Sequence, residues 1–150
     1  MSGCRTTGLA TRSSALRFRV DAAIVPSPGD GSTANDASVV LLVEVDGLRV
    51  LLTGDVEPPV QAALARSLPG LDVDVLKVPH HGSRHQDHDW LRSLDPEVVL
   101  VSVGEDNTYG HPAEATLDPL AAAGADVRRT DEEGTVLVRG GPAGPEASAR

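Results

Sequence analysis

An apolar run, a proline-led helix and a second apolar run follow one another between residues 48 and 78, and this alternation constrains the fold most. Residues 48–53 and 73–78 are short and rich in Val and Leu, which is typical of buried strands. Pro58-Pro59 fits a first helical turn, where the missing N–H of proline would have no partner. A strand, a helix and a strand over about 30 residues predict a βαβ unit with parallel strands.

A hairpin is predicted directly before this unit. Residues 38–45 form a strongly apolar run, and Asp46-Gly47 is a two-residue turn signal that leads into the strand at 48–53. Residues 16–25 alternate well enough for one or two further strand segments. Because a hairpin reverses the chain, the start of its first strand lies at the same edge of the sheet as the end of its second.

A second round of helix and strand follows the βαβ unit. Residues 87–94 are predicted as a short helix, and residues 98–103 as a continuous apolar strand. Residues 113–123 are predicted to be helical, with two interpretations open for Pro119. Either it kinks this helix, or Asp118 caps a shorter helix that begins at Pro119.

Two more strands and the chain ends complete the predicted organisation. Residues 126–130 and 135–139 are predicted strands joined at Glu132-Glu133-Gly134. The domain is expected to span 17–139, after a disordered lead-in at 1–16. Residues 140–150 consist mostly of Gly, Pro, Ala and Ser, so they are predicted to be a disordered tail.

Composition restricts the core and the class of partner. Apolar residues make up 40% of the chain but aromatic residues only 2%, so the core must consist of Val, Leu, Ile and Ala. The formal charge of -9 argues against a general electrostatic affinity for nucleic acid or for anionic membranes. It does not exclude a nucleic-acid substrate at a metal site, because the cation screens the carboxylates there.

Disulfides and membrane segments are not expected from this sequence. Cys4 is the single cysteine, which excludes an internal disulfide and a cysteine-based zinc cage. No apolar run reaches about 18 residues, so we predict no transmembrane helix and no membrane contact from this chain. Residues 1–14 are small and polar without a hydrophobic centre, so no secretory signal is expected. These features alone would place the product in the cytoplasm.

Polar side chains suited to metal or phosphate chemistry gather where the predicted strands end. They are Asp55 after the hairpin, His80 and His81 after the next strand, Asn107, Tyr109 and His111 in the loop after residues 98–103, and Asn35 and Asp36 at the entrance to the hairpin. Chemistry in open α/β sheets lies at the carboxyl ends of the parallel strands. Neutral imidazole and carboxylate are ligands that zinc, manganese or iron accept.

Each of these residues also has a purely structural interpretation. Asp55 could cap the helix that begins at Pro58-Pro59. Either histidine of the pair could be a hydrogen-bonded structural residue, and His111 could serve loop packing. Lys77, the only lysine, could extend its ammonium group to water or contact a phosphate. It is the combination at one sheet edge that favours a site.

The remaining polar residues near the histidine pair receive no catalytic role. His85 and His88 are predicted to face solvent, because nothing around them indicates burial. Ser83 could cap the helix that follows, and no base is visibly paired with it, so a serine nucleophile is not expected.

Four short runs carry a resemblance to a known family. They are LLTGD at 51–55, LKVPHHGS at 76–83, NTYGHP at 107–112 and RTD at 129–131, and NDAS at 35–38 strengthens the match. In this order and spacing they resemble the metallo-β-lactamase-like domain of the ComEC competence-protein family over about residues 17–139. The combination of LLTGD and PHHGS is specific to this branch of the superfamily.

The resemblance implies a four-layer αβ/βα sandwich that holds two divalent metal ions, zinc or manganese, and hydrolyses DNA during uptake. Asp55 resembles the carboxylate that bridges the two metals, and His81 resembles a late histidine ligand. His80 would then support the ligands, although the two histidines could exchange roles. Asn35 falls where many relatives place another histidine ligand. His111, Asn107 and Lys77 are candidates for contacting phosphate or orienting a ligand.

One departure from the family pattern restricts what this chain can do. The first metal motif of the superfamily, His-x-His-x-Asp-His, normally lies upstream of residue 17, whereas every histidine here lies at position 80 or later. A catalytic metal needs about three protein ligands and an open position for water. The chain therefore resembles the carboxyl-terminal half of such a domain, with the amino-terminal half and DNA as its expected partners.

Three functional hypotheses follow from the sequence. The first is a metal-dependent DNA phosphodiesterase of which this chain is the second half, inactive by itself. The second keeps the fold but replaces DNA with a small ester or phosphodiester. The third is a non-catalytic remnant, or a piece that pairs with a separate chain. The family domain lies on the extracytoplasmic side of the membrane, although this chain carries no segment that would take it there.

Overall fold

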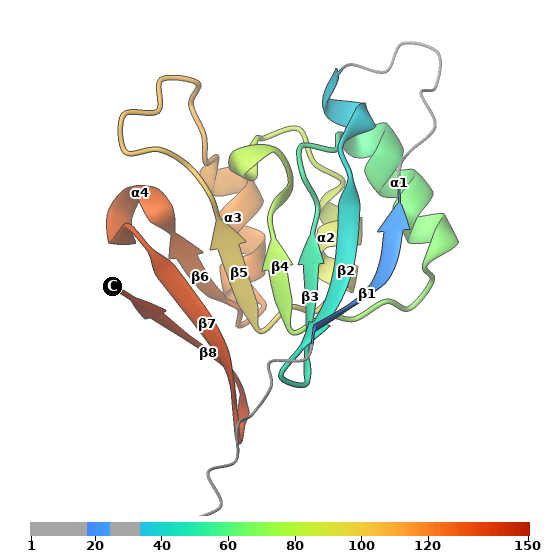
Figure 1. Cartoon of the computed structure of the whole chain (residues 1–150). Helices are drawn as coiled ribbons and strands as arrows, with labels where there is room; N and C mark the ends of the chain where they lie inside the picture. The colour runs from blue at the N-terminus through green and yellow to red at the C-terminus, as the bar shows by residue number, and fades with distance from the viewer. Residues whose placement is uncertain (1–17, 25–33) are drawn as a thin grey trace, which may run out of the picture.

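The computed structural model describes residues 18–24 and 34–150, and it has a mixed α/β fold (Figure 1). The strands are β1 (Phe18–Ile24), β2 (Val40–Val45), β3 (Leu48–Leu52), β4 (Val75–Lys77), β5 (Val98–Val101), β6 (Asp126–Arg129), β7 (Val136–Gly141) and β8 (Gly144–Ala149). The α-helices are α1 (Pro58–Ser67), α2 (His88–Ser93), α3 (Glu114–Ala122) and α4 (Thr130–Glu133), and short 3₁₀ turns span Ala34–Ala37 and Pro79–Gly82. No helix in these described ranges is long and apolar enough to cross a membrane.

Six strands form the main sheet in the order β1-β2-β3-β4-β5-β6. The predicted hairpin is confirmed, since β2 and β3 are antiparallel and Val43 lies opposite Val50. The parallel pairing of the βαβ unit is also confirmed, because β3 and β4 run parallel and Leu51 lies beside Leu76. From β3 to β6 all neighbours are parallel, so the carboxyl ends of these strands meet at one edge.

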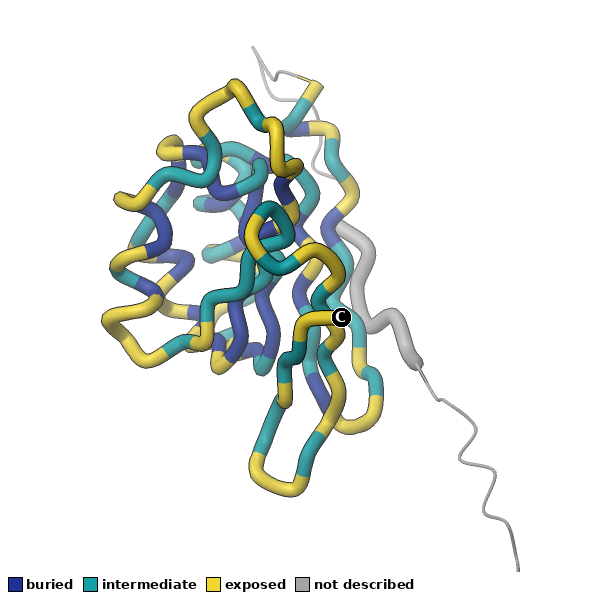
Figure 2. The backbone as a smooth tube through the Cα atoms, turned by 90° about the vertical axis from the view of Figure 1, so that its left-hand side faces the viewer, coloured by how far each residue is buried: buried dark blue, intermediate teal, exposed yellow. Residues whose placement is uncertain are grey.

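The main core lies between the sheet and α1, α2 and α3, which cover one of its faces (Figure 1). Leu51, Leu76 and Val99 project from the central strands into this core and are almost fully buried. Burial of each such side chain contributes about 1.5–3 kcal/mol. As predicted, the core is aliphatic apart from Trp90. Figure 2 shows the buried positions concentrated along the strands and the inner sides of the helices.

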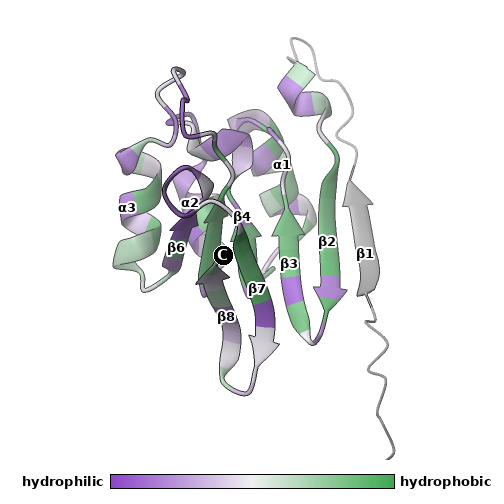
Figure 3. Cartoon of the chain, turned by 60° about the vertical axis from the view of Figure 1, so that its left-hand side comes forward, coloured by the Kyte–Doolittle hydropathy of each residue, from purple (hydrophilic) through white to green (hydrophobic). Residues whose placement is uncertain are grey.

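The hairpin of β7 and β8 lies on the opposite face of the sheet (Figure 3). Its Val138 and Ala147 pack against Leu48, Val75 and Val98 in a second, smaller apolar cluster. The prediction that residues 140–150 form a disordered tail is therefore wrong. The small side chains of this segment permit close pairing with β7. An argument from composition alone interprets the same small residues as a sign of disorder.

Two further details differ from the sequence predictions. The strands at 126–129 and 136–141 belong to different sheets and are separated by α4. Helix α3 runs through Pro119 without interruption, so the interpretation that Asp118 caps a shorter helix is wrong. The predicted lead-in at 1–16 lies outside the described residues.

Candidate metal and phosphodiester site

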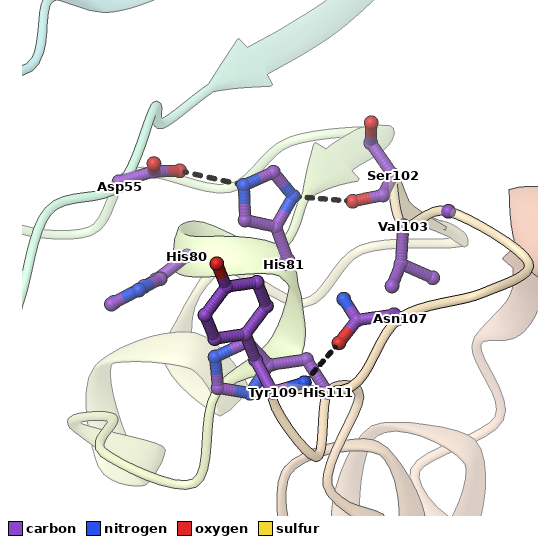
Figure 4. A pocket seen from close by; sticks show the side chains of 9 residues that line it. Asp55, His80, His81, Ser102, Val103, Asn107, Tyr109 and His111 are labelled. Carbon is purple, nitrogen blue, oxygen red and sulfur yellow. Dashed lines mark hydrogen bonds and ion pairs between the residues drawn. The ribbon is translucent and has the colours of Figure 1, made fainter.

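The loops after β3, β4 and β5 meet at the carboxyl edge of the sheet and enclose a pocket of about 500 Å³. Its lining consists of Asp55, His80, His81, Ser102, Val103, Gly104, Asn107, Tyr109 and His111 (Figure 4). Five residues predicted from the sequence as ligands or catalytic groups are thus brought together. The other two, Lys77 and Asn35, lie beside this lining rather than in it.

Asp55 and His81 face each other in the pocket (Figure 4). The Nε2 atom of His81 lies 3.6 Å from Oδ1 of Asp55. Its Nδ1 atom lies 2.5 Å from the carbonyl oxygen of Ser102, which can only accept a hydrogen bond. Nδ1 must therefore donate, and the lone pair of a neutral imidazole stays on Nε2, toward Asp55. Histidines that bind metals are oriented in the same way by a carbonyl or carboxylate partner.

The turn that carries Asp55 is bonded to its neighbours on both sides. The amide of Asp55 donates to Ser38 Oγ at 3.0 Å, and Thr53 Oγ1 donates to the carbonyl of Lys77 at 2.7 Å. The amide of His80 donates to the carbonyl of Gly54 at 3.1 Å, which links the two functional loops directly. Asp55 does not cap α1, because the N-cap position is Glu57 and its side chain makes no capping bond.

Lys77 is half-buried beside this turn rather than extended into solvent. Its Nζ atom donates to the Gly54 carbonyl at 3.1 Å and lies 3.8 Å from Oδ1 of Asp55. Burial lowers the pKa of the Lys77 ammonium group, and the carboxylate of Asp55 partly opposes this shift. Lys77 thus places a hydrogen-bond donor behind the carboxylate.

The histidine pair has an unusual backbone conformation. His80, His81 and Gly82 all have positive φ angles, of 47°, 54° and 77°. For residues with a Cβ atom, this left-handed conformation costs roughly 1–2 kcal/mol each. Gly82 also admits the neighbouring loop, since a Cβ atom there would lie 2.8 Å from Cβ of Pro112. The turn is therefore a strained segment that its surroundings must hold in place.

Two buried glutamines, which the sequence analysis missed, supply this support. Gln86 Nε2 donates to the carbonyls of Pro79 and Ser83, both at 3.0 Å, and these two residues flank the strained turn. Gln61 Nε2 in turn donates to Gln86 Oε1 at 2.7 Å. Gln61 and Leu64 both lie on the buried face of α1. A polar residue within an apolar helical stripe is the signal that could have identified Gln61 from the sequence.

His80 and His111 form a second pair of imidazoles at the pocket. Their ring centroids lie 5.3 Å apart, and the Nδ1 atom of each is buried without a hydrogen-bond partner. The nearest acidic group to His80 is Glu57, whose Oε1 lies 3.8 Å from Nδ1. Asn35, predicted as a metal ligand, donates through Nδ2 to the same Glu57 oxygen at 3.0 Å. A buried unpaired polar atom is costly unless water or a ligand completes its hydrogen bonds.

The environment of His111 predicts a pH dependence of stability. Burial is the main cause that lowers the pKa of His111, and His80 and His81 lower it further. The unfolded chain takes up this proton near pH 6.5, whereas the folded chain does so only at lower pH. Unfolding therefore binds a proton in this window, and the free energy of unfolding should fall as pH decreases below about 6.5.

The variant His111→Gln should weaken this dependence, which urea unfolding at pH 7.5 and at pH 5.5 would measure. His85→Gln removes an exposed histidine outside the pocket and serves as the control. An identical pH dependence in the parent chain and in His111→Gln would contradict the prediction.

The ligand set is incomplete for a catalytic metal centre. Among residues 34–150, whose side chains the structure describes, no three His, Cys, Asp or Glu side chains lie close enough together to hold a metal ion. Asp55 and the Nε2 atom of His81 have the donor chemistry and orientation of ligands, but catalytic zinc has three protein ligands. The described pocket therefore fits one side of such a centre and not the whole of it.

Comparison with known proteins gives the chain a family context. No family model matches it. It is 34% identical over 125 residues to ComE operon protein 3 of Bacillus subtilis, 35% identical over 121 residues to Competence protein ComA of Neisseria gonorrhoeae, and 35% identical over 105 residues to Recombination protein 2 of Haemophilus influenzae. These matches cover 83%, 77% and 69% of the chain. These homologues support the placement of this chain in a competence-protein family.

The three relatives are much longer than this chain. The matched regions span 16%, 18% and 13% of the three relatives. These homologues support the competence link that LLTGD and PHHGS predicted. Their names specify neither a metallo-β-lactamase-like domain nor a hydrolase, so the activity of the site has to be argued from its chemistry.

Proposed function

We propose that this chain is the carboxyl-terminal half of a metal-dependent phosphodiesterase domain, of the metallo-β-lactamase type, that acts on DNA in competence. The observation that carries the proposal is the pair of Asp55 and His81, in which the Ser102 carbonyl turns the lone pair of His81 toward the carboxylate. A carboxylate and a neutral imidazole at the carboxyl edge of a parallel sheet suit a divalent cation.

Asp55 and His81 are the residues that would hold metal, zinc or manganese, with two ions in the intact domain. The ions would supply an activated water and stabilise negative charge on phosphorus. The remaining ligands would come from the amino-terminal half, which carries the first metal motif in the superfamily. Asn35 would add a polar group at the edge of this site, because its bond to Glu57 places it beside the histidine turn (residues 79–83).

The remaining residues at the site would either contact the phosphodiester or hold a metal ligand in place. The imidazole rings of His80 and His111 line the pocket and would contact phosphate oxygens there. Asn107 lines the same pocket, and Lys77 would keep Asp55 in place through the Gly54 carbonyl. DNA would reach this site on the extracytoplasmic side of the membrane, as the resemblance implies for the intact protein.

The isolated chain and a chimera test this proposal together. The chain alone should bind Mn²⁺ or Zn²⁺ weakly in calorimetry and should not cleave plasmid DNA, because two ligands are too few. The chimera replaces the matching 125 residues of ComE operon protein 3 with this chain, which restores the upstream sequence. It should cleave DNA with Mn²⁺, and Asp55→Asn should reduce the rate at least about a hundredfold.

Several outcomes would overturn the proposal. Ordinary cleavage by the isolated chain would contradict the division of ligands between two halves. A folded chimera without activity would favour the alternative of a non-catalytic piece. The acidic balance of -9 favours a third outcome, hydrolysis of a small ester or phosphodiester without cleavage of DNA. Bis(p-nitrophenyl) phosphate and p-nitrophenyl acetate would be assayed in parallel to detect it.

A further inference from the structure

Tyr109 lines the pocket with the one phenol ring there, and the proposed chemistry leaves this ring without a role. It is the only tyrosine and is 85% exposed as a residue, whereas Trp90, the only tryptophan, is buried in the core. Single exposed apolar residues are ordinary on protein surfaces. The position of this one is not ordinary, because it lies on the rim of the pocket that holds Asp55, His81 and His111 (Figure 4).

The loop holds the backbone of Tyr109 in a defined position. Its amide donates to Asn107 Oδ1 at 2.7 Å, and the amide of Asn107 donates to the carbonyl of Gly104 at 3.1 Å. At the far end of the loop, the amide of Ala113 donates to the carbonyl of Gly82 at 2.8 Å. An aromatic ring is thus presented openly from a backbone that is tied to the histidine turn.

An open aromatic ring beside a phosphodiester site suits a ligand with a flat π face. We propose that Tyr109 is a stacking platform for a nucleobase next to the phosphodiester that enters the pocket. The proposal rests on the proposed phosphodiesterase function for the reacting group, but stacking itself needs no catalysis. Base–aromatic stacking contributes about 1–3 kcal/mol per base and is tolerant of sequence.

The charge of the chain gives this contact particular weight. Proteins that bind nucleic acid usually draw most of their affinity from basic side chains on the phosphates. A chain with 22 acidic and 13 basic residues lacks that general attraction. Stacking on Tyr109 would retain the strand near the pocket without requiring positive charge, and it would distinguish a nucleotide from a small ester.

The single tyrosine provides its own reporter. The full chain would be labelled with 3-fluorotyrosine, which gives one ¹⁹F resonance, and titrated with a thymidine tetranucleotide. An abasic tetranucleotide of the same length and charge is the control ligand. The thymidine ligand should shift the resonance progressively to lower frequency, as a stacked ring does, and the abasic ligand should not. Equal shifts with both ligands, or no shift with either at millimolar concentration, would overturn the proposal.

Affinity measurements on variants separate stacking from other roles of the loop. Tyr109→Ala should weaken binding of the thymidine tetranucleotide at least about fivefold, and Tyr109→Phe should stay within about twofold of the parent. Leu137→Ala, which removes an exposed apolar side chain on β7, should have no effect. Equal affinity in Tyr109→Ala and the parent chain would overturn the stacking proposal.

The proposed function and the stacking platform can fail independently. A base-dependent ¹⁹F shift together with an inactive chimera would retain the platform and remove the phosphodiesterase. Cleavage by the chimera that is unchanged by Tyr109→Ala would retain the phosphodiesterase and remove the platform.

Discussion

Replacing Gly54 with alanine is expected to lower the free energy of unfolding by about 3 kcal/mol. The residue has a φ of +60°, and an added Cβ atom would lie only 2.6 Å from Cβ of Ser38. The left-handed conformation and the overlap act together, so either the turn or the segment that leads into β2 must move. Because Ser38 Oγ accepts the hydrogen bond of the Asp55 amide, this movement would also displace the carboxylate.

Gly47 offers a matched control for this experiment. Its φ of +81° is also left-handed, but a Cβ atom there would have no neighbour within 4 Å. Gly47→Ala should therefore cost only about 1 kcal/mol. Thermal unfolding would show the contrast, with a melting temperature roughly 6–12 °C lower for Gly54→Ala than for the parent chain. Equal losses in the two variants would mean that close approach to Ser38 does not constrain the turn.

Replacing Gln61 with leucine should be about as damaging, at about 3 kcal/mol, because it leaves buried partners without hydrogen bonds. Gln61 is fully buried, donates to the carbonyl of Val56 at 2.8 Å and accepts from the amide of Asp87 at 2.6 Å. Its bond to Gln86 is also lost, so Gln86 would hold the histidine turn less firmly. Urea unfolding measures the loss, and hydrogen exchange of the His80 and Ser83 amides should accelerate.

A double-mutant cycle tests whether the two glutamines act as a unit. Gln61→Leu and Gln86→Leu share one hydrogen bond, so their combined cost should fall short of the sum by about 0.5–3 kcal/mol. Thr116→Val is the control, because Thr116 Oγ1 also donates to the Ser83 carbonyl, at 2.8 Å, but has no hydrogen bond to either glutamine. It should cost about 1 kcal/mol. Additive losses for the glutamines would show that they do not form one network.

The parts of the fold that could be predicted depend on short-range patterns. Asp46-Gly47 specifies a hairpin locally, and the alternation of apolar runs with a proline-led helix specifies parallel pairing. Because β3 and β4 are parallel, the loops that follow them lie at the same edge of the sheet. For this reason Asp55 and His81 were expected to lie close together. No distant residue had to be known for these steps.

The parts that could not be predicted depend on contacts between distant residues. The left-handed conformation of His80 and His81 is unfavourable for such residues, and it exists because Gln86 holds both ends of the turn. Gln86 in turn depends on Gln61, which is 25 positions away. Ordering of β8 likewise requires the apolar face of β3, β4 and β5 beneath the hairpin. A composition or periodicity argument contains none of this information.

The attachment of the loop after β5 has a consequence for how such a site can diversify. Asp55 and His81 stand on strand ends joined by backbone hydrogen bonds, whereas residues 104–110 are mostly exposed and are internally held through Asn107. Substitutions in this loop can alter what is recognised without disturbing the groups that would perform the reaction. Selection could therefore change the preferred ligand at little cost in folding, whereas substitution of the glutamines beneath the histidine turn should destabilise the fold.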